Sequence, residues 1–116
     1  MDDIEEKEME LFGKCPFVTT QKLISGKWAI LILHHLDGQT KRFGELQRNL
    51  GEITQSTLTK QLRYLEDEGL ITRTVYPEVP PRVEYRLTAI GQEFHAVLEQ
   101  IEVWGGKYIR TLKEGN

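Results

Sequence analysis

The amino-acid sequence predicts a mainly α fold of the α+β class, in which an N-terminal helical extension and three core helices precede a β-hairpin and a long final helix. Two observations predict it. Two short amphipathic segments, 43–50 and 54–65, are separated only by a turn that contains Gly51. The hydrophobic period then becomes β-like over 70–87, before a helical pattern returns over about 89–112. With 116 residues and no long repeat, we expect a single domain over 1–116.

The N-terminal third predicts two helices of different character. The segment over about 1–12 is acidic and helix-prone, and its weak apolar stripe needs another surface to pack on. Pro16 disfavours helix at the residue before it, so we expect this helix to end there. The run 28–36 is too apolar for a surface helix. We therefore expect a buried central helix, which ends at Asp37-Gly38.

The next two segments have the pattern of a helix-turn-helix. Phe43, Leu46 and Leu50 recur at helical spacing, and Gly51 ends the first helix. Thr54 is a plausible N-cap for the second helix. That helix directs three leucines inward: Leu58, Leu62 and Leu65.

The C-terminal half predicts a β-hairpin, called the wing below, and a final helix whose apolar stripe is too long to be covered by the core of one chain. Segments 70–76 and 83–87 are β-rich, and the connection 77–82 contains three prolines, which predicts a stiff hairpin tip. Thr88 is a candidate cap for the last helix, over about 89–112. Its apolar stripe is so long that part of it should face another chain. The order of elements is that of a winged helix-turn-helix with helical extensions at both ends.

The outward face of the second helix of the pair carries the candidate function. With its leucines inward, this helix directs hydroxyl, amide and cationic side chains outward, and no acid interrupts them before Glu66. Such groups read base edges and contact phosphates in the major groove of DNA. The alternative is an ordinary solvated helix face. The outward residues are Gln55, Ser56, Thr59, Lys60 and Arg63.

The charge distribution does not exclude DNA. The net charge is −3, but the first ten residues contribute −5 and the remaining 106 sum to +2. Local charge decides whether a phosphate backbone is attracted. Lys41 and Arg42, just before the helix pair, are candidate phosphate contacts, and Arg82 in the wing is a candidate for the minor groove.

Several motifs resemble the HxlR-type, MarR-like bacterial transcriptional regulators. They are Gly26-Lys27-Trp28, Arg42-Phe43-Gly44-Glu45-Leu46, Leu65-Glu66-x-x-Gly69-Leu70-Ile71 and the stretch from Tyr76 to Tyr85, and the resemblance covers Cys15 to about Trp104. It implies a recognition helix that begins near Thr54. It also implies DNA contact at seven matching positions: Gln55, Ser56, Thr57, Thr59, Lys60, Arg63 and Arg82.

The resemblance further implies a homodimer whose interface combines the N- and C-terminal helices. Apolar residues of both helices are the expected contacts: Ile4, Leu11, Phe12, Phe94, Val97, Ile101, Trp104 and Tyr108. Two recognition helices would then meet a pseudo-palindromic operator on double-stranded DNA.

Cys15 occupies the Cys-Pro position that some HxlR-type regulators use as a redox sensor. A thiol reacts as its thiolate, and Lys14 or a helix N-terminus would favour that form. The alternative is a small buried apolar residue, as many unpaired cysteines are. An oxidant or a small molecule is therefore the effector class that we expect.

Other classes of function fit the sequence less well. No nucleophile–base pair or phosphate loop is visible, so we expect neither an enzyme nor a cofactor. One cysteine and three histidines, two of them adjacent, predict no metal site. The longest apolar run has six residues and the acidic N-terminus resembles no secretion signal, so we expect a cytoplasmic protein without a membrane partner. The competing interpretation is a winged helix for protein–protein assembly, which would need an apolar or acidic recognition face.

Overall fold

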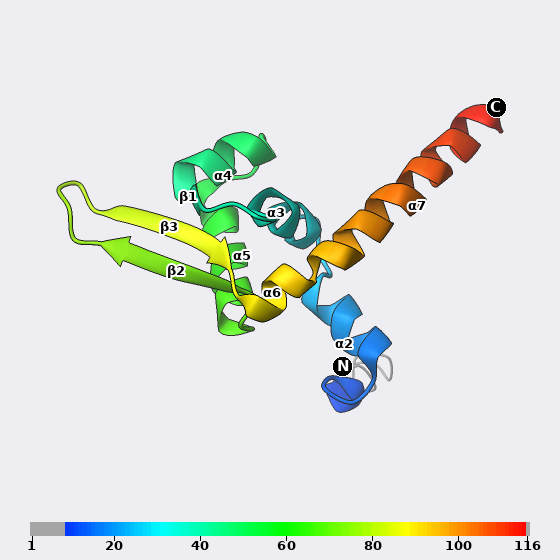
Figure 1. The fold of residues 1–116 in the computed structure, drawn as a ribbon, viewed down its shortest axis with the longest axis horizontal. Helices are drawn as coiled ribbons and strands as arrows, with labels where there is room; N and C mark the ends of the chain where they lie inside the picture. Colours follow the sequence, from blue (N-terminus) through cyan, green and yellow to red (C-terminus); the bar gives the residue numbers. More distant parts are fainter. Residues whose placement is uncertain (1–8, 116) are drawn as a thin grey trace.

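The computed structural model describes residues 9–115 and confirms the predicted mainly α fold with a small antiparallel sheet (Figure 1). Residues 9–11 are helical, whereas Ile4 and most of the expected N-terminal helix lie outside the described residues. The elements are α2 (Pro16–Leu23), α3 (Ala29–Leu36), β1 (Lys41–Arg42), α4 (Phe43–Leu50), α5 (Gln55–Asp67), β2 (Ile71–Tyr76), β3 (Arg82–Leu87), α6 (Ala89–Glu93) and α7 (His95–Glu114).

The core is built around α3, as the apolar run in the sequence predicts. Ile32, Leu33 and Leu36 of α3 are almost fully buried. They meet Leu46 of α4 and the three inward leucines of α5 in one cluster. Each such side chain contributes about 1.5–3 kcal/mol through burial, so this cluster fixes α4 and α5 against the rest of the domain. Within the described residues, no helix is long and apolar enough to cross a membrane.

The turn between α4 and α5 lies where Gly51 and Thr54 predict it. Gly51 follows α4 with φ of 75°, a left-handed conformation that glycine adopts without steric cost. Thr54 then caps α5, because its Oγ1 accepts a hydrogen bond of 3.2 Å from the backbone N–H of Thr57. This cap fixes the residue at which the outward face of α5 starts.

The sheet has the order β1-β3-β2 and contains one strand that the sequence pattern did not predict. β2 and β3 pair antiparallel from Ile71↔Leu87 to Tyr76↔Arg82, and residues 77–81 form the projecting loop. β1 has two residues and pairs with β3 through Lys41↔Tyr85. Two residues are too few to show an alternating pattern, which is why β1 escaped prediction.

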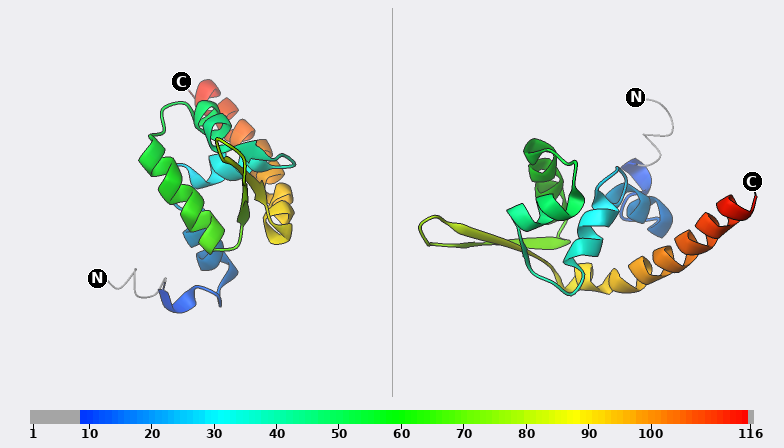
Figure 2. Two further views of the ribbon diagram at one scale, coloured as in Figure 1. Left: turned by 90° about the vertical axis from the view of Figure 1, so that its left-hand side faces the viewer. Right: turned by 90° about the horizontal axis from the view of Figure 1, so that it is seen from above.

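The expected single helix over 89–112 is divided at Phe94, and this is a correction to the sequence-based prediction. Thr88 caps the short α6, since its Oγ1 accepts from the Gly91 N–H at 3.1 Å. At Gly91, an added Cβ would lie 2.2 Å from the Leu70 carbonyl oxygen, so α6 lies directly against the start of the hairpin. The Phe94 amide then donates a hydrogen bond to the Gly91 carbonyl, three residues back, and α7 extends from there away from the domain (Figure 2).

Candidate nucleic-acid interface

The outward face of α5 is polar, exposed and free of internal partners for its cations. Gln55, Ser56, Lys60 and Arg63 are exposed. Neither Lys60 nor Arg63 makes a hydrogen bond or ion pair within the part of the chain that the structure describes. Two full positive charges are therefore available to an external anion.

Two threonines among the expected DNA contacts, Thr57 and Thr59, are less free than the sequence predicts. Both are half-buried. The Thr57 Oγ1 accepts a hydrogen bond of 2.9 Å from the Thr54 hydroxyl, and the Thr59 Oγ1 donates one of 2.8 Å to the Gln55 carbonyl. These bonds fix the first turn of α5, and they leave oxygen lone pairs of Thr59 available to a donor from outside.

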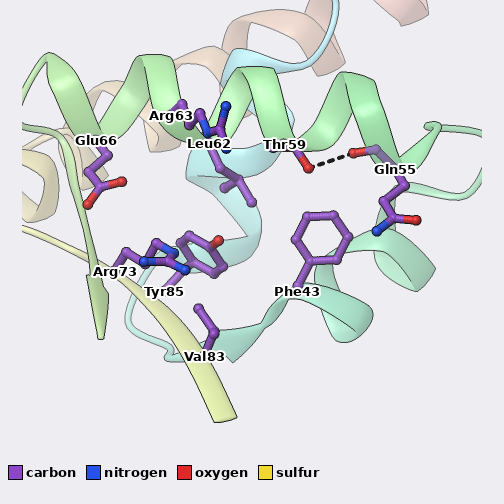
Figure 3. A pocket seen from close by; sticks show the side chains of 9 residues that line it. All are labelled: Phe43, Gln55, Thr59, Leu62, Arg63, Glu66, Arg73, Val83 and Tyr85. Carbon is purple, nitrogen blue, oxygen red and sulfur yellow. Dashed lines mark hydrogen bonds between the residues drawn. The ribbon is translucent and has the colours of Figure 1, made fainter. Parts of the chain in front are cut away.

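A groove of about 450 Å³ separates α5 from the face of the sheet (Figure 3). Its α5 side carries Gln55, Thr59, Arg63 and Glu66. The other lining residues are mostly apolar: Phe43, Leu62, Val83 and Tyr85. The exception is a cation on β2, Arg73, which was not among the predicted site residues. The sequence places Arg73 in a predicted strand, but it does not tell which face of the sheet the side chain lies on. The pairing of Arg73 with Tyr85 decides this.

Arg82 lies at the base of the wing loop and is engaged there. Its Nη1 is 3.4 Å from Glu78 Oε1 and its Nε is 3.5 Å from Glu84 Oε2. Its guanidinium carbon also lies 4.1 Å from the centre of the Tyr76 ring. The Nε is buried without a hydrogen bond. In the free protein, Arg82 therefore closes the hairpin, while the tip of the loop exposes Val79.

The two cations that precede α4 differ in their freedom. Lys41 Nζ donates a hydrogen bond of 2.6 Å to Asn49 Oδ1, which ties β1 to the end of α4. Arg42 is exposed, and its backbone N–H donates to Glu45 Oε1 at 3.0 Å, which stabilises the first turn of α4. Arg42 is thus the better placed of the two for an external phosphate.

The expected interface residues of α7 expose a long apolar face. Leu98 packs on the core, and beyond it the helix extends away from the domain (Figures 1 and 2). Trp104 is 66% exposed and stacks on Tyr108 with a centroid distance of 5.4 Å. Of the other expected residues, Phe94 packs against the core of its own chain and Phe12 is half-buried. The rest are exposed: Leu11, Val97 and Ile101.

Cys15 is the N-cap residue of α2 and carries a free, half-buried thiol. Its backbone N–H donates to the Leu11 carbonyl at 2.8 Å, and its own carbonyl accepts from Thr19 at 2.9 Å. These bonds fix the backbone that carries the thiol at a helix N-terminus.

Comparisons with known proteins agree with this architecture. Residues 23–113 match the family model described as HxlR-like helix-turn-helix. The HTH-type transcriptional regulator YdeP of Bacillus subtilis is 46% identical over 97 residues, which cover 84% of this chain and 76% of that protein. The redox regulator HypR in its reduced form superposes with a TM-score of 0.81 at 39% identity, covering 86% of this chain and 99% of the other. The reduced form of the transcriptional regulator YodB from B. subtilis superposes with a TM-score of 0.72 at 33% identity, covering 81% of this chain and 93% of the other.

Proposed function

The chain belongs to the HxlR-like helix-turn-helix family and is a transcriptional regulator rather than an enzyme, and on this premise we propose that it binds double-stranded DNA sequence-specifically as a homodimer. The observation that carries the proposal is the outward face of α5, which is mostly exposed, is free of acids up to Glu66 and carries two cations that have no partner within residues 9–115. Its place of action would be the cytoplasm, because chromosomal DNA is its proposed partner.

In this proposal α5 enters the major groove. Gln55 and Ser56, at the start of the helix, read base edges, and each such contact is worth about 1–3 kcal/mol of discrimination. Lys60 and Arg63 lie one and two turns further and contact phosphates. The remaining proposed contacts come from the same helix, β1 and the wing: Thr57, Thr59, Lys41, Arg42 and Arg82.

The homodimer is supported by the apolar face of α7. A helix that exposes two stacked aromatic side chains beyond its own core carries the kind of apolar surface that marks a protein–protein contact. A second copy of α7, with the N-terminal segment, is the proposed cover. The two α5 helices would then meet half-sites about 34–36 Å apart.

The test is a selection of random-sequence duplexes by the reduced protein at low salt. We expect enrichment of a pseudo-palindrome whose half-sites lie about one helical turn apart. Within it, Gln55→Ala should change preference at one base position per half-site, whereas Lys60→Ala should weaken all sequences alike. Enrichment of no sequence would contradict the proposal and favour the winged helix as a protein–protein module.

Sensing of oxidants through Cys15 is the second function we propose. It is favoured by the place of Cys15 at the start of α2 and by the similarity to HypR, a redox regulator solved in reduced and oxidised forms. In the homodimer, two Cys15 thiols would each give up one hydrogen atom to diamide and join as one disulfide, while diamide is reduced to its hydrazine. The new link would change the spacing of the two α5 helices.

The control for this second function is Cys15→Ser, which removes the only cysteine of the chain. Diamide should change the operator affinity of the wild type and produce a disulfide-linked dimer on a non-reducing gel. The Cys15→Ser protein should show neither effect. An equal response of both proteins to diamide would refute the role of Cys15.

A further inference from the structure

Arg73 of β2 is a cation for which neither the sequence motifs nor the fold of the core supplies a role. It is exposed, and within the described residues it makes no hydrogen bond or ion pair. Every other arginine of the hairpin is engaged: Arg82 by Glu78 and Glu84, and Arg86 by the Thr72 hydroxyl. We propose that Arg73 contacts the DNA backbone from the sheet side of the groove, an inference that rests on the proposed DNA binding.

The register of the hairpin decides which way Arg73 points. Arg73 is the Cα partner of Tyr85, and residues that pair across two antiparallel strands share one face of the sheet. Tyr85 is buried and belongs to the core, so Arg73 lies on the face that looks toward α5. Arg86 and Thr72 form the neighbouring pair and therefore lie on the opposite face.

The groove places Arg73 across from the proposed recognition helix. Figure 3 shows Arg73 beside Tyr85 and beneath α5, with Arg63 and Glu66 on the α5 side. These three are the charged groups that line the groove, so two guanidinium groups share it with one carboxylate. The groove is therefore electropositive without any internal salt bridge among the described residues.

The position of Arg73 fits a contact with a phosphate of the DNA strand that borders the major groove. A helix in a groove about 12 Å wide has a phosphate backbone along each side. An element packed beside that helix meets the backbone rather than the bases. Arg73 lines a groove whose other sheet-side residues, Val83 and Tyr85, are largely apolar, and a phosphate held there would lose less of its attraction to screening by water than at a fully exposed lysine.

The competing explanation is that the Arg73 side chain only covers Tyr85 with its apolar stem. Two substitutions separate these roles. Arg73→Met keeps a flexible apolar stem and removes the charge, whereas Arg73→Lys keeps a charge and removes the planar fork. A stem that merely covers Tyr85 would tolerate methionine, and a phosphate contact would tolerate lysine better.

The experiment measures affinity for the selected duplex over a range of salt concentrations, with Arg86→Met as the matched control on the opposite sheet face. Arg73→Met should bind about tenfold more weakly and reduce the slope of log K against log salt by about 0.9 per protomer. Arg86→Met should change neither value, and Arg73→Lys should retain the wild-type slope.

Each outcome has one meaning. If the wild type binds DNA and Arg73→Met has the slope of Arg86→Met, the role of Arg73 is refuted while the proposed function stands. A loss of affinity at unchanged slope would likewise assign Arg73 to packing and overturn the inference. If the wild type binds no duplex in any salt, both the proposed function and this inference fail.

Discussion

At the scale of single residues, Arg82 of the wing forms ion pairs that it would have to break in order to contact DNA. Arg82 lies between Glu78 and Glu84, and a contact with DNA would replace at least one of these carboxylates. Both sides of the Glu78 pair are partly exposed, at 29% and 52%, so solvent screening keeps the pair weak. Loss of the Glu78 pair alone would therefore cost roughly 0–1 kcal/mol.

We predict that Glu78→Gln strengthens DNA binding, because it releases Arg82 and removes a negative charge from the wing. A double-mutant cycle with Arg82→Ala separates the two causes. The gain from Glu78→Gln should shrink in the Arg82→Ala background by a coupling of about 0.5–1 kcal/mol, measured as operator affinity. An equal gain in both backgrounds would mean that Glu78 acts through its own charge alone.

A histidine links α7 to the core at the point where α7 begins. His95 Nδ1 lies 2.6 Å from Asp37 Oδ2, just after α3, and Nε2 lies 2.5 Å from Glu99 Oε1. Its hydrogen bond to Asp37 raises the pKa of His95 above 6.5, with further contributions from the charges of Asp37 and Glu99. Two carboxylates facing both ring nitrogens favour the doubly protonated imidazolium.

We predict that this link weakens as the pH rises. A pKa raised by folding adds stability that is complete below the unfolded value of 6.5 and is lost as pH rises through the folded pKa. The midpoint of thermal unfolding of the wild type should therefore fall as the pH rises from about 6.5 through the folded pKa, and His95→Gln should lack this component. The pKa of His35 is lowered, first by burial, so its contribution is lost at acidic pH and does not overlap. Identical profiles of wild type and His95→Gln above pH 6.5 would refute the link.

At the scale of elements, local pattern predicted those parts of the fold whose signals are local. α4 and α5 follow from leucines at helical spacing and from Gly51 and Thr54 at their ends. The outward face of α5 followed from the same spacing, because inward leucines leave only one direction for the other residues. The break at Phe94 and the orientation of Arg73 depend on contacts between distant segments, with Leu70 and Tyr85. A periodicity cannot report such contacts.

The close approach at Gly91 leads to a prediction about α6. Gly91→Ala would place a methyl group 2.2 Å from the backbone oxygen of Leu70, which cannot rotate away. Overpacking of this kind costs about 1–3 kcal/mol, so the free energy of unfolding measured in urea should fall by that amount. Gly44→Ala in α4 is the control, since its new methyl group would meet only the flexible Arg48 side chain at 3.4 Å. Unchanged stability of Gly91→Ala would show that α6 is free to move off the hairpin.

At the scale of the whole molecule, the described chain is more extended than a compact domain of similar length. Its radius of gyration is 16.4 Å, whereas a compact domain of about 100 residues has about 13 Å. The excess comes from the wing and from α7, which project in different directions (Figure 2). The proposed function assigns a partner to each projection: the wing would contact DNA, and the exposed apolar face of α7 would pack against a second copy of the chain.

Two adjacent glycines of α7 allow this homodimer to be tested with a matched pair of variants. Gly105 follows Ile101 by four residues and precedes Tyr108 by three, so it lies on the apolar face. Gly106 lies four residues from Glu102 and from Arg110, on the polar face. Alanine at either position should favour the helix by about 1 kcal/mol. We predict that Gly106→Ala raises stability and leaves dimerisation unchanged, because its methyl group faces solvent.

Gly105→Ala should instead weaken the dimer, because a glycine on the apolar face lets a second backbone approach closely and a methyl group would hold it away. Sedimentation velocity over a range of concentrations measures both dissociation constants, and Trp104→Glu provides the monomeric reference. Equal dimerisation of the two alanine variants would place the interface away from Gly105. A wild type that stays monomeric at all concentrations would refute the homodimer and, with it, the spacing of two α5 helices that a palindromic operator requires.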